Sequence, residues 1–117
     1  MTEIDSSAFT SCRGLTNITL PNRLTSIGEY AFAECSSLPN ITIPDSVITI
    51  ENAAFAGSAL EYITIPDSVI TISNDAFYSC ESMTNIVIGN NVKTIGNYAF
   101  EECEDLLSIT IPDSVTD

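Results

Sequence analysis

The side chains best suited to covalent or metal chemistry are four cysteines. Cys12, Cys35, Cys80 and Cys103 each stand three residues after a phenylalanine. If stretches of this spacing stack on one another, the pairs Cys12–Cys35 and Cys80–Cys103 could form disulfides or stay as small buried thiols. Parallel side chains in a stack favour the thiols, because their β-carbons lie further apart than a relaxed disulfide requires. Four ligands spread along such a stack cannot converge to a tetrahedral zinc site.

A second set of polar side chains recurs at one place in the pattern. Asp45, Asp67 and Asp113 each follow a proline, and Asn22 and Asn90 occupy the equivalent places. These residues suggest a calcium ladder, but calcium takes six to eight oxygen ligands, and only the first two aspartates are acidic neighbours. Hydrogen bonds to the backbone of a turn explain the same residues without an ion. We therefore expect no metal and no cofactor.

The densest charge is an acidic patch of Glu101, Glu102, Glu104 and Asp105. Paired carboxylates act in catalysis only in a cleft that separates their pKa values, and this patch is expected on an exposed corner. A solvated, mutually repelling surface is the simplest interpretation. The alternative is a contact for a basic partner, attracted by long-range electrostatics.

Composition excludes several classes of function. The 117 residues carry 16 acidic side chains, three basic ones and no histidine, for a net charge of −13. Three cations cannot form the basic surface that nucleic-acid binding needs. Without histidine there is no Ser-His or Cys-His pair, so we expect no enzyme. No apolar run approaches the roughly 18 residues of a membrane span, and residues 1–12 lack the features of a signal peptide.

The elements that position these residues follow from an internal repeat. Phenylalanine recurs at positions 9, 32, 55, 77 and 100, always after alanine, and an Ile-x-Ile or Ile-x-Leu segment recurs in step. Self-similarity at this period is typical of a solenoid, in which each coil buries its apolar face against the next. We expect one domain, 1–117, without separate caps. Its repeats are approximately 1–23, 24–46, 47–68, 69–91 and 92–114.

Each part of a unit has a predicted structure, as the second unit illustrates. Segment 40–43 alternates polar and β-branched residues, which predicts a half-buried strand. Pro44 ends that strand, and residues 45–46 supply a turn. A short second segment, 47–50, places two apolar side chains inward. Residues 54–55 then carry the chain round a helical or 3₁₀ corner.

The unit L-x-x-I-x-I-P-D-S-V-x-x-I followed by A-F-x-x-C resembles the BspA-type leucine-rich repeat. The resemblance implies a right-handed superhelix of about five coils, in a leucine-rich-repeat solenoid of α/β to mainly β class. A parallel β-sheet would form one, concave face, with short 3₁₀, helical or extended segments on the others. It also implies a cell-surface or extracellular adhesion or interaction module without catalytic or cofactor-binding residues. The third unit is one residue short after Phe55, and Gly89 replaces proline in the fourth; both are expected to be local adjustments.

The outward side chains of the predicted strands form the candidate partner-binding face. Tyr62 and Val87 interrupt an otherwise small and polar surface, and tyrosine is enriched where binding energy concentrates. A plain solvated sheet with threonine pairs is the competing interpretation. The ten residues are Asn17, Thr19, Asn40, Thr42, Tyr62, Thr64, Asn85, Val87, Ser108 and Thr110.

The sequence thus predicts a non-catalytic module that binds a protein partner. The pattern is cut in mid-unit at both ends, which suggests a fragment of a longer surface protein or end-to-end self-association through uncapped coils. The alternative function is an intracellular acidic regulator that inhibits another protein by occupying its basic surface.

Overall fold

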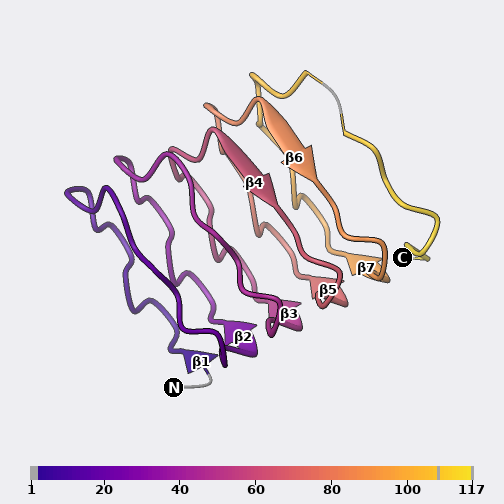
Figure 1. The fold of residues 1–117 in the computed structure, drawn as a ribbon. Coiled ribbons are helices and arrows are strands. Elements are labelled where there is room, and N and C mark those ends of the chain that lie inside the picture. The colour runs from indigo at the N-terminus through magenta and orange to yellow at the C-terminus, as the bar shows by residue number, and fades with distance from the viewer. Residues whose placement is uncertain (1–2, 108, 117) are drawn as a thin grey trace.

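The computed structural model describes residues 3–107 and 109–116, in which the chain winds through similar turns stacked side by side (Figure 1). Every strand is two or three residues long, and no helix occurs in these two ranges. The strands are β1 (Glu3–Ile4), β2 (Ser26–Ile27), β3 (Thr49–Ile50), β4 (Tyr62–Thr64), β5 (Thr71–Ile72), β6 (Asn85–Val87) and β7 (Thr94–Ile95).

The expected parallel sheet is present. Strands β1, β2, β3, β5 and β7 pair in that order, so each strand lies beside its counterpart from the next repeat (Figure 1). Ile27 pairs with Ile50, and Ile50 pairs with Ile72, which is the period of the sequence repeat. This stacking of equivalent elements is that of a repeat-protein solenoid. The right-handed course and the count of about five coils stay predictions.

The sequence placed the main sheet on the wrong segments. The five-stranded sheet is built from the second segment of each unit, represented by β3, rather than from segments such as 40–43. Among the latter, only β4 and β6 pair as strands, and Ile65 extends the pairing with an N–H bond to the carbonyl of Val87 (2.7 Å). This pair includes the unit in which Gly89 replaces proline. A β-carbon at Gly89 would lie 2.4 Å from the carbonyl oxygen of Pro66, so the missing side chain allows the close approach.

The predicted turn after the proline is confirmed. The N–H of Val47 donates to the carbonyl of Pro44 (3.1 Å), closing a four-residue turn. The same bond closes in the next unit from Val69 to Pro66 (3.1 Å), and in the fourth unit the carbonyl of Gly89 takes the place of the proline carbonyl. Proline sets the backbone for this turn and donates no hydrogen bond, so the strand before it ends there.

The helical or 3₁₀ corner is not observed in the described residues. Ala31 and Ala33 donate to carbonyls three residues earlier (3.1 Å each), as a 3₁₀ helix would require. Tyr30 and Phe32, between and beside them, instead donate to carbonyls of the next repeat (3.0 and 2.7 Å). Tyr30 and Glu34 also have positive φ angles (58° and 57°), which interrupt any helix. Because every second N–H serves the neighbouring repeat, the corner is a series of single turns.

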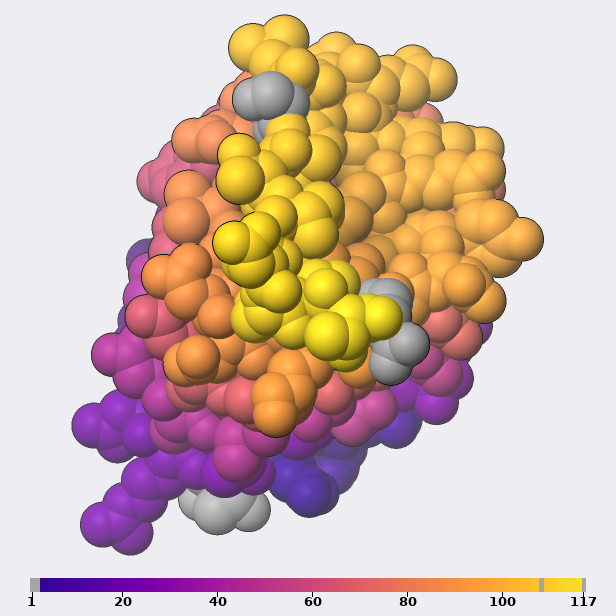
Figure 2. All heavy atoms as spheres, turned by 90° about the vertical axis from the view of Figure 1, so that its right-hand side faces the viewer, coloured from indigo at the N-terminus to yellow at the C-terminus, as the bar shows by residue number. Residues whose placement is uncertain are grey.

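A column of phenylalanine rings runs through the core behind these corners. Successive rings are nearly parallel, with centroids 5.2–5.5 Å apart. Phe32, Phe55 and Phe77 are fully buried, whereas Phe9 and Phe100 in the outer repeats are partly buried. Figure 2 looks onto one end of the stack, where the last repeat faces the viewer. The repeat pattern therefore produces one continuous apolar column.

Candidate binding face

The predicted face residues that the structure describes are all exposed. Nine of the ten fall in the described ranges, and each is solvent-exposed on segments equivalent to β4 and β6. Ser108 lies outside the described residues. The inward neighbours, such as Ile41 and Ile63, are buried, as the alternation predicts. Their common exposure is shown; their role in binding stays a prediction.

These nine residues line three adjoining hollows on one face. The central hollow has a volume of about 680 Å³, and those on either side have about 370 Å³ each. The central one shares Thr42 with one neighbour and Val87 with the other, so the three form a continuous trough. We call this surface the trough. Its exposed lining includes Asn17, Thr19, Asn40, Thr42, Tyr62, Thr64, Asn85, Val87 and Thr110, with Asp45 and Asp67 at one rim.

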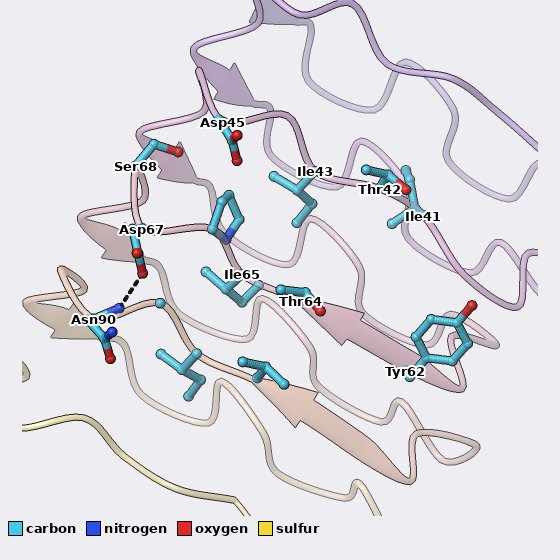
Figure 3. A pocket seen from close by; sticks show the side chains of 14 residues that line it. Ile41, Thr42, Ile43, Asp45, Tyr62, Thr64, Ile65, Asp67, Ser68 and Asn90 are labelled. Atoms are coloured by element: carbon cyan, nitrogen blue, oxygen red, sulfur yellow. Dashed lines mark hydrogen bonds between the residues drawn. The ribbon is translucent and has the colours of Figure 1, made fainter.

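Two large side chains stand at the centre of the trough. Tyr62 on β4 is 53% exposed and Val87 on β6 is 52% exposed. The pairing sets Tyr62 opposite Asn85 and Thr64 opposite Val87, so the aromatic and the aliphatic group lie diagonally on neighbouring strands. Figure 3 shows Tyr62 at one end of the central hollow and the aspartates at the other. The trough thus combines an apolar part with a polar rim.

The aspartate rim makes the backbone hydrogen bonds that the sequence suggests, at one position. The Asp67 carboxylate accepts the N–H of Asn90 at 2.8 Å (Figure 3), and the side-chain amide of Asn91 donates to the Asp67 carbonyl at 2.9 Å. Asp67 therefore ties its turn to that of the next repeat. No group of three or more acidic or cysteine ligands is placed to hold a metal within residues 3–107 and 109–116.

The acidic patch lies apart from the trough. Glu101, Glu102, Glu104 and Asp105 are all exposed, and none of them lines the trough. Ser79 of the preceding repeat donates a hydrogen bond to Glu102 at 2.8 Å. The Glu102 carboxylate also accepts a hydrogen bond from the Tyr78 phenol, which raises the pKa of Tyr78 above its ordinary value. The patch is an open anionic corner without a cleft.

All four cysteines are free thiols. Cys35, Cys80 and Cys103 each donate an S–H bond to a phenylalanine carbonyl of the preceding repeat, at 3.1–3.2 Å. A hydrogen bond with Cys103 and burial raise the pKa of Cys80, and burial raises that of Cys35. Protonated thiols are poor nucleophiles, so these cysteines stabilise the corners.

Sequence reasoning missed one further hollow, of about 610 Å³, on the corner side. Arg13 and Glu34 approach within 3.8 Å at its edge, and Gly57 contributes no side chain to its floor. The signal was available, because the third unit is one residue short and has glycine where its neighbours have serine or glutamate. The lining is otherwise mainly serine and alanine.

No helix in the described part of the chain is long and apolar enough to cross a membrane. A comparison with curated proteins found no match.

Solved structures share this fold. A leucine-rich repeat protein of T. pallidum is 36% identical, with a TM-score of 0.93 over 96% of this chain. A leucine-rich repeat protein from Bacteroides ovatus is 28% identical, with a TM-score of 0.67 over 98%. The pneumococcal vaccine antigen PcpA is 24% identical, with a TM-score of 0.76 over 98%, and shares the fold. This chain spans 53%, 36% and 33% of these three proteins, respectively.

The family comparison matches nearly the whole sequence. A family described as BspA type Leucine rich repeat region matches residues 2–117 in six copies. The five complete units and one partial unit of the sequence pattern agree with that number. The stacked phenylalanines, the proline turn and the thiol at each corner are the structural counterparts of the motif. The chain belongs to the BspA-type leucine-rich repeat family.

Proposed function

We propose that this chain is a non-catalytic module that binds a protein partner through the trough, within a cell-surface adhesion or interaction protein. The observation that carries the proposal is the continuous hollow face with two large, half-exposed side chains at its centre. Leucine-rich repeat families generally act as interaction modules, and the resemblance implies the surface setting. The described residues offer a shaped surface, and a rigid stack presents it at little cost in ordering.

Replacing Tyr62 tests this proposal. Tyr62→Ala removes a side chain that is 53% exposed and central to the trough. We expect the affinity for a partner, found by probing an array of extracellular proteins with the purified chain, to fall at least about tenfold, which is 1.4 kcal/mol. Surface plasmon resonance measures the change.

Tyr98→Ala is the matched control, because Tyr98 is 63% exposed and lies outside the trough. It is expected to change the affinity less than about twofold, within the ordinary range for surface substitutions. Both variants should keep the circular dichroism spectrum of the parent. Equal losses in the two variants would assign binding to another face.

An intracellular acidic regulator is the second candidate function. The exposure of all four carboxylates of the acidic patch favours it, together with the net charge of −13. A complex held mainly by such charges weakens steeply as salt screens them, whereas a contact centred on Tyr62 weakens much less. Repeating the affinity measurement at low and high salt therefore separates the two functions.

The outer repeats suggest a further property of the 117-residue polypeptide. Phe9, Phe100, Leu106 and Ile109 pack against the core yet are only partly buried, unlike their counterparts in the middle repeats. Covering this surface with a second copy would bury it, and we expect mass to increase with concentration in light scattering. A constant monomer mass over a hundredfold range of concentration would contradict end-to-end association.

A further inference from the structure

Two polar groups at the rim of the trough have no hydrogen-bond partner within the described chain. The Asp45 carboxylate is exposed and makes no hydrogen bond or ion pair there. The hydroxyl oxygen of Ser68 is buried and also unpartnered. A buried hydroxyl usually has a partner, so Ser68 calls for an explanation.

The equivalent serines show what Ser68 lacks. Ser46 donates its hydroxyl to the carbonyl of Leu24 at 2.5 Å, and Ser114 donates to the carbonyl of Val92 at 2.7 Å. Ser68 stands in the same place of its own repeat but does not make this bond to the preceding repeat. Figure 3 shows its hydroxyl on the side of Asp45, at the rim of the central hollow. An unused oxygen therefore lies between two carboxylates.

The chemistry of this rim is that of an acceptor for a cation. Asp67 uses one carboxylate oxygen for the N–H of Asn90 and keeps the other. Asp45, Asp67 and Ser68 thus present oxygen atoms from two adjacent repeats, and no lysine or arginine lines the trough. Two carboxylates and one hydroxyl fall short of the six to eight oxygens that calcium takes.

A guanidinium group suits this arrangement better than an ammonium group. Equivalent positions in paired strands of neighbouring repeats lie about 4.8 Å apart, so acceptors in both repeats are within reach of one planar group. Guanidinium has five N–H donors in a fixed fork and is weakly hydrated, whereas ammonium is a compact, strongly hydrated charge.

We propose that Asp45, Asp67 and Ser68 form a subsite for an arginine side chain of the partner. This inference rests on the proposed function, because it describes the segment that the trough would hold. Tyr62 stands five residues before Asp67 in the same repeat, about 16 Å along an extended chain. The bound segment is therefore extended, with an arginine at the rim and an apolar side chain near Tyr62 and Val87.

The subsite can be tested without the partner. The probe is N-acetyl-arginine amide, titrated into the ¹⁵N-labelled 117-residue chain while amide chemical shifts are recorded. We expect saturable shifts confined to the amides around Asp45, Ser68 and Asn90, and at least about fivefold weaker binding of N-acetyl-lysine amide. Asp45→Asn combined with Asp67→Asn should weaken the arginine probe at least about tenfold.

Asp113→Asn is the matched control, since Asp113 has the same place in its repeat and the same charge but lies outside the central hollow. It should change the affinity less than about twofold. Shifts centred on the acidic patch, equal losses in the control, or tight calcium binding at the rim would each overturn the subsite. Such a result leaves the Tyr62 experiment unaffected, so failure of the subsite and failure of the proposed function are distinguishable.

Discussion

Phe55→Ala is expected to lower the free energy of unfolding by about 3–5 kcal/mol, the range observed when a buried phenylalanine is truncated. Phe55 is fully buried and stacks on Phe32 and Phe77, with centroid distances of 5.4 and 5.3 Å. Its removal leaves a cavity in the middle of the column, and the two neighbouring rings lose their packing partner. Because each repeat contacts only its neighbours, the damage cannot be shared with a separate core. Urea unfolding followed by circular dichroism measures the loss.

Phe9→Ala provides the comparison within the same column. Phe9 is only partly buried and stacks on Phe32 alone. Its truncation removes less buried area and leaves a site that water can enter, so the expected loss is clearly smaller. Equal effects at the two positions would mean that the column does not act as a continuous core.

Gly89→Ala should destabilise the chain by about 1–3 kcal/mol, the cost of forcing extra atoms into a packed site. The added β-carbon would lie 2.4 Å from the carbonyl oxygen of Pro66 and 2.8 Å from that of Ile65. Both are backbone atoms, so the two repeats must move apart. Gly89→Pro, which restores the residue that the repeat pattern specifies, should cost at least as much.

Gly14→Ala is the control for that substitution, since a β-carbon there would meet nothing within 4 Å. Its effect should stay within about 0.5 kcal/mol. Hydrogen exchange supplies a local measurement: in Gly89→Ala the Ile65 amide, bonded to Val87 at 2.7 Å, should exchange faster. A stabilising Gly89→Pro would show that the close approach of the repeats is not needed.

The position of Gly89 shows where sequence reasoning reaches its limit. The missing proline was interpreted as a local adjustment of a loop, yet it stands in the one unit whose strand pairs with β4. The corners show the same limit. Alanine and phenylalanine there are compatible with a helical turn, but the N–H groups of Tyr30 and Phe32 bond to the next repeat. Local pattern does not reveal such bonds, because the acceptors lie one repeat away.

The candidate site divides in the same way. Alternation along each segment predicted which side chains face outward, and the nine described residues are exposed. The same pattern identified Tyr62 and Val87 as exceptions to a polar surface. It could not reveal the hollows between repeats or the unpartnered hydroxyl of Ser68, since both depend on the spacing of neighbouring backbones.

The sequence by itself determined the period, the family, the phenylalanine column, the proline turns and the outward face. Each of these is a property of one residue type recurring at one place, and repetition multiplies the signal. Only the tertiary structure decided which segments pair as sheet, how the corners turn and where the trough opens. These depend on hydrogen bonds and close approaches between repeats, which differ by tenths of an ångström and are shared by residues more than twenty positions apart.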